Sequence, residues 1–322
     1  MTGLPKGYRL RHASLADIPA AQRVLDAAES ADCGEPRRHE NRLELDFRGP
    51  HVDLARDAWV VSAPAESADP IVAVALVLRP HASGEIAADQ YVHPEHRGRG
   101  ICAALLDAIE ARAVELAATL AAGVSATLVV WAEPAVAEYS APLEARGFAA
   151  TRQYFEMRID LGDELEIPRW PDGITPRPLR VGRDEPQLHA ADTEAFAEHH
   201  MFEPRPYAEW RFHHVDRPDF DPGLWPIGWD GDEIAGYAAA LVADDGGMVG
   251  DLAVRRPWRG RGLGLALLLE EFRALAARGV TVVRLYVDGQ NATGAVALYE
   301  KAGMHIARRF DVLEKRLTPV AP

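Results

Sequence analysis

The feature of this sequence that most constrains its fold is an internal repeat. Residues 92–100 (VHPEHRGRG) resemble residues 254–262 (VRRPWRGRG), and in both copies a valine stands five residues before the first arginine of the RGRG run. Two further pairs of segments match in the same order and at similar separations, 5–11 with 171–177 and 143–148 with 299–304. Three matches in register predict that the chain contains two copies of one domain.

The length supports this division, because 322 residues suit two ordinary domains and either half can bury a core of its own. We predict an N-terminal domain at 1–160 and a C-terminal domain at 174–322. Residues 161–173 are polar and contain prolines and acidic residues, so we predict that they form the linker.

Both copies have the same predicted order of elements. In the second copy, a strand at 247–254 leads into an arginine–glycine loop and then into a long helix that ends near Gly279. Strands and helices mix without strict alternation along each copy. This predicts an α/β fold in which a mixed sheet carries helices on both faces.

Composition and charge exclude several classes of protein. No stretch of 18 apolar residues occurs and the N-terminus is polar, so we expect a cytoplasmic protein without a membrane partner. The two cysteines, Cys33 and Cys102, predict no disulfide framework and no cysteine metal cluster, and we expect no metal. The net charge of −14 argues against a nucleic-acid partner. We expect a monomer or a homodimer.

The arginine–glycine loop at 259–264 (RGRGLG) is the segment that most suggests chemistry. A glycine loop between a strand and a helix presents unpaired backbone N–H groups at the positive end of the helix dipole, and two arginines add mobile positive charge. The expected ligand is a phosphate or a diphosphate, and the alternative is a solvent-exposed turn. The repetition of the loop at the same point in both copies favours binding. The glycine spacing fits neither the dinucleotide fingerprint nor the phosphate loop of nucleotide hydrolases.

Two segments of the second copy resemble one known family, the GCN5-related N-acetyltransferases. The loop at 259–264 fits the acyl-CoA signature of that family, R/Q-x-x-G-x-G/A. The segment at 287–303 resembles the second motif of the family and retains Asn291, Tyr299 and Gly303. The resemblance covers residues 174–318, and the tandem arrangement is similar to that of two-domain members of the family.

The resemblance implies that acetyl-CoA, the acyl-donor substrate, lies between two strands that splay apart. The pantetheine arm would pair with a free strand edge, and the diphosphate would bind the loop amides. The implied cofactor-binding residues are Leu252, Ala253, Val254, Arg259, Gly260, Arg261, Gly262, Leu263, Gly264 and Asn291, with Tyr91, Val92, Arg97, Gly98, Arg99 and Gly100 in the first copy.

The resemblance also implies that the amine of a small-molecule acceptor attacks the thioester directly. This agrees with the absence from the sequence of a recognisable Cys-His or Ser-His-Asp motif. Tyr299 is the implied acid that protonates the departing sulfur, or it only donates a hydrogen bond to it. Asp251, which precedes the pairing edge, is the candidate general base, and its alternative role is that of a solvated residue at the start of a strand.

Several residues before these motifs have two possible roles. The pairs His199-His200 and His213-His214 suggest a metal, but neighbouring helical side chains point about 100° apart, so one ion would not bind both. His199, His200 and Glu203 lie in the region that lines the acceptor site in this family, and the histidines are predicted to line that site or to be solvated. Trp210 and Phe212 are predicted to lie in the core or to form one wall of the acceptor pocket. Trp225 and Trp229 alternate with Ile227 along a strand and are predicted to lie in the core or on a sheet face.

The first copy departs from the family pattern. Ala135 and Leu143 stand where the second copy has Asn291 and Tyr299. Cys102 ends the first loop at the position where Gly264 ends the second. We therefore predict a structural first copy whose loop amides can still bind coenzyme A, and a catalytic second copy. The predicted function is acetyl-CoA-dependent N-acetylation of a small molecule. The alternatives are a noncatalytic acyl-CoA sensor or scaffold and an enzyme with a nucleotide cofactor.

Overall fold

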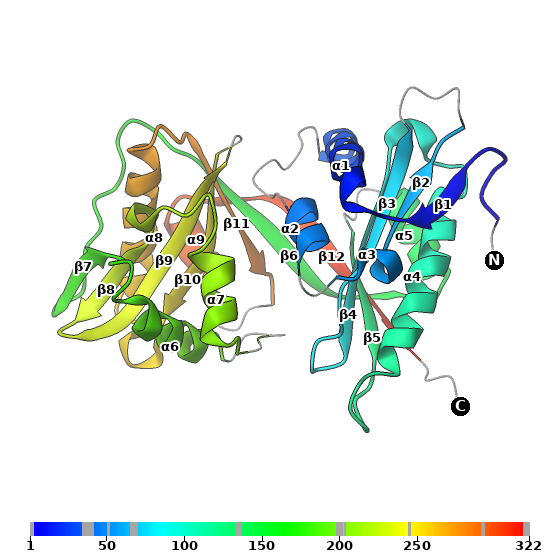
Figure 1. Ribbon diagram of the computed structural model, residues 1–322. Coiled ribbons are helices and arrows are strands. Elements are labelled where there is room, and N and C mark those ends of the chain that lie inside the picture. Colours follow the sequence, from blue (N-terminus) through cyan, green and yellow to red (C-terminus); the bar gives the residue numbers. More distant parts are fainter. Residues whose placement is uncertain are drawn as a thin grey trace. The chain divides into compact units, whose positions relative to one another are not determined.

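The computed structural model describes residues 3–33, 42–49, 52–64, 70–132, 137–197, 202, 204–243, 246–290 and 294–317. The chain forms two compact units (Figure 1). The first unit comprises Met1–Gln153 and Arg309–Pro322, and the second comprises Tyr154–Arg308.

The first unit contains a sheet whose strands lie in the order β1-β2-β3-β4-β5-β12. Its elements are β1 (Arg9–His12), η1 (Leu15–Asp17), α1 (Ile18–Cys33), α2 (Arg42–Arg48), α3 (Leu54–Asp57), β2 (Ala58–Ser62), β3 (Ile71–Val77), β4 (Glu85–Val92), η2 (Pro94–His96), α4 (Ile101–Ala117), β5 (Thr127–Ala132), α5 (Ala137–Glu144), the start of β6 (Ala149–Asp160) and the end of β12 (His305–Arg316).

The second unit contains a sheet in the order β6-β11-β10-β9-β8-β7. Its elements are the end of β6, β7 (Ile174–Pro178), α6 (Glu185–Phe196), α7 (Tyr207–His214), η3 (Pro222–Leu224), β8 (Pro226–Asp230), β9 (Glu233–Ala243), β10 (Gly246–Val254), η4 (Arg256–Trp258), α8 (Leu263–Ala276), β11 (Val282–Asp288), α9 (Ala295–Lys301) and the start of β12. Strands β10 and β11 are parallel, whereas β6, β8 and β9 pair with their neighbours antiparallel. The predicted α/β class with a mixed sheet is therefore confirmed.

The last strand of each sequence copy pairs within the unit that consists mainly of the other copy. Residues 154–160 of β6 pair with β11 in the second unit, and residues 311–316 of β12 pair with β5 in the first unit. The compact units consequently differ from the predicted boundaries at 160 and 174. The repeat could not indicate this exchange, because the backbone edge of a sheet accepts either of two equivalent final strands.

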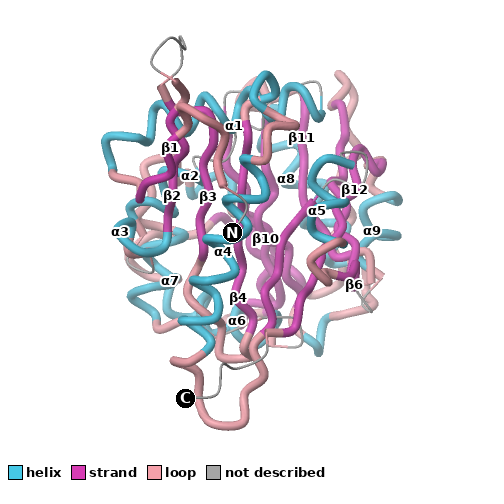
Figure 2. The backbone as a smooth tube through the Cα atoms, turned by 90° about the vertical axis from the view of Figure 1, so that its right-hand side faces the viewer, coloured by secondary structure: helices cyan, strands magenta, loops and turns pink. Residues whose placement is uncertain are grey.

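Helices cover both faces of each sheet. In β3 of the first unit, Val74 and Leu76 pack in one core with α1, whereas Ala73 and Ala75 pack in another with α4, which Figure 2 shows beside β4. Because successive strand residues point to opposite faces, this alternation explains why every residue of β3 is buried. In the second unit, α8 packs on the face of β9 that carries Ala235 and Ala238. The opposite face carries Tyr237 and packs against α6 and α7. No helix within the described part of the chain has the length and apolar character needed to cross a membrane.

One carboxyl group of α8 is buried without a hydrogen bond from the described residues. Glu271 is 0% exposed, and neither of its carboxyl oxygens has a hydrogen-bond partner among the described residues. Burial raises the pKa of Glu271 well above its ordinary value, since the charge of Arg278 offsets only part of the desolvation. A carboxyl whose pKa is higher in the folded than in the unfolded protein destabilises the fold progressively as pH rises above the unfolded value.

We therefore expect Glu271→Leu to stabilise the protein by about 1–3 kcal/mol near neutral pH, the typical cost of an unsatisfied buried polar group. Thermal unfolding should show a higher midpoint for the variant at pH 8, with a smaller difference at pH 5. The control is Glu270→Leu on the neighbouring, partly exposed position. A Glu271 variant that unfolds at a lower temperature than the wild type at both pH values would contradict this account.

Candidate active site

Strands β10 and β11 separate soon after they begin. Gly247 and Met248 pair with β11, and no residue of β10 beyond Met248 pairs with it among those the structure describes. The register of β10 against β9 shifts between Val249 and Asp251, which places a β-bulge at Gly250. A bulge bends its strand and increases the local twist, so it accounts for the divergence. In the first unit, the pairing of β4 with β5 ends at Ala88 among the residues that the structure describes.

The edge of β10 beyond the bulge presents backbone groups to this opening. The N–H of Arg255 donates to the carbonyl of Ala235 on β9. Because hydrogen-bonded and non-hydrogen-bonded pairs alternate in an antiparallel ladder, Ala253 also faces β9, whereas Leu252 and Val254 face the opening. The structure therefore refines the predicted edge at 252–254 to the backbones of these two residues. The same alternation directs Val92 towards the opening of the first unit and Tyr91 towards β3.

The loop that follows β10 begins helix α8 with unpaired amides. Gly260 and Gly262 have φ angles of 72° and 88°, in the left-handed region where glycine is unstrained. No acceptor among the described residues bonds the amide N–H of Gly260, Arg261, Gly262, Leu263 or Gly264. In the first copy, Gly98 and Gly100 have φ angles of 69° and 81°, and Gly100 precedes α4. Such amides at a helix start suit an anion.

The first arginine of each loop has a structural role. The Nε of Arg259 donates to the carbonyl of Val254 at 2.9 Å, and its Nη2 donates to the carbonyl of Ala195 at 3.2 Å. In the first copy, the Nε of Arg97 donates to the carbonyl of Val92 at 3.2 Å, and the guanidinium pairs with Asp32 at 2.5 and 2.8 Å. This explains the valine–arginine spacing in both copies.

These contacts correct the expectation of mobile positive charge for the first arginine of each loop. The second arginine also has a partner within the chain. Arg261 donates to the carbonyl of Asp172 at 3.0 Å, and Arg99 donates to the carbonyl of Glu95 at 3.1 Å. Both contacts are exposed to solvent. The unpaired amides at 260–264 are therefore the best-defined candidate groups of this loop for binding an anion.

Gly264 packs closely against α9. A Cβ atom at this position would lie 3.2 Å from the Cδ2 of Leu298, closer than most real contacts. The first copy has Pro142 at the position that corresponds to Leu298, counted back from Gly147. Cys102 occupies the position that corresponds to Gly264, and its Sγ accepts a hydrogen bond from Gln90 at 3.3 Å.

The two predicted catalytic residues lie close enough to interact electrostatically. Asp251 follows the bulge and pairs with Ala239, on the face of the sheet that carries Tyr237. Tyr299, on α9, is 9% exposed, and its hydroxyl has no hydrogen-bond partner among the described residues. Burial, with a smaller contribution from the negative charge of Asp251, raises the pKa of Tyr299 to about 12.

His214, for which the sequence argued against a metal role and suggested no catalytic one, contacts Asp251. The Nε2 of His214, at the end of α7, lies 3.5 Å from the Oδ2 of Asp251, and its Nδ1 lies 2.8 Å from the carbonyl of Trp210. Burial lowers the pKa of His214, but the hydrogen bond and charge of Asp251, the Trp210 carbonyl and the charge of Asp192 together raise it above its ordinary value. No sequence signal connects α7 with β10, so this pair was missed.

A second carboxyl group lies beside this pair. The hydroxyl of Tyr237 donates a short hydrogen bond to Asp192 on α6. Burial and then the charge of Asp251 raise the pKa of Asp192, although the Tyr237 hydrogen bond opposes the shift. Burial and the charges of Asp251 and Asp192 raise the pKa of Tyr237 well above its ordinary value. Asp251 thus lies at the centre of a cluster of ionisable groups.

Aromatic rings enclose the cluster. Trp210 is 1% exposed and stacks on His214 with 4.9 Å between ring centroids, and Trp225 stacks on Tyr237 at 6.2 Å. Trp225 and Trp229 are buried as predicted, whereas Phe212 is 54% exposed and does not line the core. Five residues considered in the sequence analysis lie outside the described part of the chain: Ala135, His199, His200, Glu203 and Asn291.

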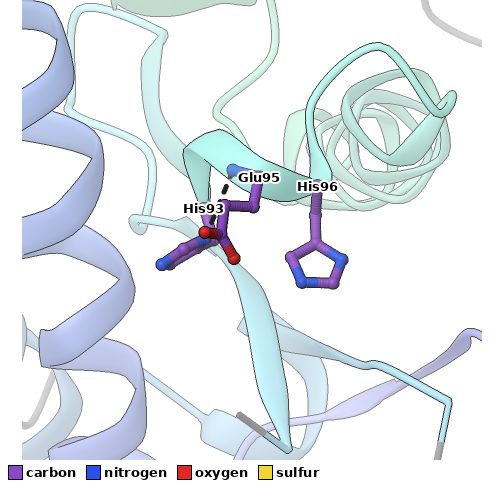
Figure 3. A group of neighbouring side chains, drawn as sticks. All are labelled: His93, Glu95 and His96. Carbon is purple, nitrogen blue, oxygen red and sulfur yellow. Dashed lines mark hydrogen bonds between the residues drawn. The ribbon is translucent and has the colours of Figure 1, made fainter. Parts of the chain in front are cut away.

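The first copy carries a different group of side chains in front of its loop. His93, Glu95 and His96 have potential metal-ligand atoms within 4.8 Å of one another (Figure 3). The Nδ1 of His93 accepts a hydrogen bond from the Glu95 amide at 3.4 Å, and the Nδ1 of His96 is 2.8 Å from the hydroxyl of Tyr8. Arg255, Pro257 and Trp258 stand at the corresponding positions of the second copy, so this group belongs to the first copy alone.

The same arrangement of bulged or splayed strands, glycine loop and helix occurs twice in one chain, and one sequence family accounts for both. The chain belongs to the acetyltransferase (GNAT) family, since the sequence model of that family matches it at residues 24–139 and again at 186–304. It is therefore an N-acetyltransferase with two tandem GNAT domains, and this fold implies acetyl-CoA as the donor.

Relatives and solved structures agree with this assignment. The mycothiol acetyltransferase of Streptomyces scabiei is 32% identical over 94% of both chains, and that of Catenulispora acidiphila is 29% identical over 97% of this chain and 99% of its own length. A GCN5-related N-acetyltransferase from Sphaerobacter thermophilus has a TM-score of 0.83 and 31% identity over 99% of this chain and 98% of its own. A tandem GNAT protein from the clavulanic acid biosynthesis pathway shares the fold, with a TM-score of 0.70 and 17% identity, over 98% of this chain and 100% of its own.

Proposed function

We propose that the second unit transfers the acetyl group of acetyl-CoA to the amine of a small molecule by direct attack of the amine on the thioester. The observation that carries this proposal is the free edge of β10, which runs from Asp251 to the unpaired amides before α8. The pantetheine amides would hydrogen-bond to the backbone of Leu252 and to the N–H of Val254, whose carbonyl already accepts from Arg259. The diphosphate would bind the amides at 260–264, where the helix dipole favours negative charge.

Asp251 is proposed to receive the proton that the acceptor must lose. An alkyl ammonium with a pKa of about 10.4 costs roughly 4–5 kcal/mol to deprotonate at pH 7. Two carboxyl groups, those of Asp251 and Asp192, interact with the single imidazole of His214. This part of the site therefore favours a cationic acceptor.

Tyr299 is proposed to stabilise the departing sulfur by a hydrogen bond. Its pKa of about 12 lies roughly 3.5 units above the 8.5 of a thiol, so complete proton transfer would be uphill by roughly 5 kcal/mol. A hydrogen bond from the neutral hydroxyl requires no such transfer, and the hydroxyl has no competing partner among the described residues. Of the two roles predicted for Tyr299, the structure therefore favours hydrogen-bond donation.

The acceptor is proposed to belong to the class used by the mycothiol acetyltransferases. This proposal rests on similarity along nearly the whole of both chains rather than on one motif. The first unit is proposed to have a structural role, because Leu143 supplies no hydroxyl at the position of Tyr299 and is buried in the core.

The test of this function is an acetyl-transfer assay. Purified protein with acetyl-CoA and a panel of amines that includes the amine precursor of mycothiol should yield free coenzyme A and an N-acetylated product, both measured by chromatography with mass detection. Chromatography is preferable to a thiol reagent, since an acceptor that carries a thiol would react with the reagent. Tight acetyl-CoA binding without turnover across the panel would favour a noncatalytic sensor instead.

A further inference from the structure

We propose that His214 and Asp251 act as one proton acceptor, in which Asp251 contacts the acceptor amine and His214 holds the proton. This proposal rests on the proposed acetyl transfer and concerns the same site. It assigns a role to a residue of α7 that neither loop motif indicates.

The contacts of His214 fix the state of its ring. A backbone carbonyl can only accept, so the contact with Trp210 at 2.8 Å requires a proton on Nδ1. In the neutral ring, the lone pair of Nε2 then faces the Oδ2 of Asp251 at 3.5 Å. Two acceptors facing each other repel, and a proton between them converts this repulsion into a charge-assisted hydrogen bond. The geometry therefore favours uptake of one proton by the pair.

The order of the two residues follows from their exposure. The side chain of Asp251 is 26% exposed and that of His214 is 19% exposed, with Trp210 stacked on one side of the imidazole and Trp225 at its edge. Asp251 also lies on the strand that continues into the free edge at 252–254. An amine that attacks a thioester held along that edge would meet Asp251 first, and His214 would act through it.

The two carboxyl groups that interact with His214 favour its imidazolium form. Asp251 faces it from β10, and Asp192 interacts with it from α6. Tyr237 on β9 bonds to Asp192, and Tyr299 on α9 interacts with Asp251, but both hydroxyls stay neutral because burial raises the pKa of each. His213 precedes His214 on α7, and His189 on α6 lies against the ring of Trp210. Efficient proton acceptors have a pKa near the operating pH, which suits an imidazole better than an isolated carboxylate.

The proposed steps balance as follows. The ammonium gives one proton to Asp251, and the proton passes to Nε2 of His214, which leaves a neutral amine. The amine nitrogen then forms a bond to the thioester carbon, and the carbon–sulfur bond breaks with its electron pair on sulfur, where Tyr299 donates a hydrogen bond. The second proton of the nitrogen neutralises the thiolate, and the pair releases its own proton to solvent.

The first experiment compares the pH dependence of kcat/KM in the wild type and in His214→Gln. Glutamine keeps a hydrogen-bond donor near Asp251 but cannot store a proton. We expect kcat to fall about 10²-fold, the ascending limb of the profile to move, and acetyl-CoA binding to stay unchanged. The matched control is His189→Gln, which also removes a ring packed against Trp210. An unchanged pH profile in His214→Gln would overturn the proposal.

The second experiment needs no turnover. The imidazole signals of His214, followed by NMR across a pH titration, should give a pKa above the ordinary 6.5, and Asp251→Asn should lower it. Equal values in both proteins would overturn the pairing. A wild type that binds acetyl-CoA and acetylates no amine would contradict the proposed function itself. An active enzyme whose pH profile does not change in His214→Gln would contradict only the role of His214.

Discussion

Gly262→Glu is expected to weaken acetyl-CoA binding by about 10²–10³-fold, which isothermal titration calorimetry can measure. The new carboxylate would lie among the amides proposed to hold the diphosphate, and like charges a few ångströms apart near a protein surface repel by about 4 kcal/mol. The φ angle of 88° adds backbone strain for any residue with a side chain.

The control for this variant lies at the other end of the same helix. Gly279 has a φ angle of 80° and, like Gly262, has nothing within 4 Å of a Cβ built on it, so Gly279→Glu reproduces the strain and the charge away from the proposed site. Gly100→Glu tests the loop of the first unit. Loss of binding in Gly100→Glu alone, or normal binding in Gly262→Glu, would show that the proposed site is wrong.

Tyr299→Phe is expected to lower kcat by about 10²-fold while the KM for acetyl-CoA and its binding stay nearly constant. Loss of one hydrogen-bond donor to a developing negative charge typically costs this much, and the substitution removes only an oxygen atom. Steady-state kinetics combined with calorimetry would separate the two quantities.

The control for Tyr299→Phe is the loss of another tyrosine hydroxyl, in the first unit. Tyr8→Phe removes the contact with His96 and should leave turnover unchanged. If Tyr299→Phe weakened acetyl-CoA binding as strongly as it slowed turnover, the hydroxyl would serve binding in general rather than the departing sulfur.

The loop motifs could be predicted from the sequence because their function depends on local backbone geometry. Gly260 and Gly262 allow left-handed conformations at a strand–helix junction, and the amides that they expose belong to consecutive residues. The role of Arg259 was misjudged for the opposite reason. Its guanidinium donates to the carbonyls of Val254 and Ala195, and Ala195 lies on a helix more than sixty residues away in the sequence. The positive charge of an arginine does not predict which carbonyls it will contact.

The sequence by itself determined that this chain has two related α/β domains, where its acyl-CoA-type loops lie, and that only the second retains the tyrosine. Periodicity, glycine positions and repeated motifs encode these features within short segments. Tertiary structure alone decided which sheet each final strand joins and which groups surround Asp251. The reason is that β6, β12, α6 and α7 meet their partners through backbone edges and side-chain packing across long sequence separations, and such contacts leave no periodic trace in either segment.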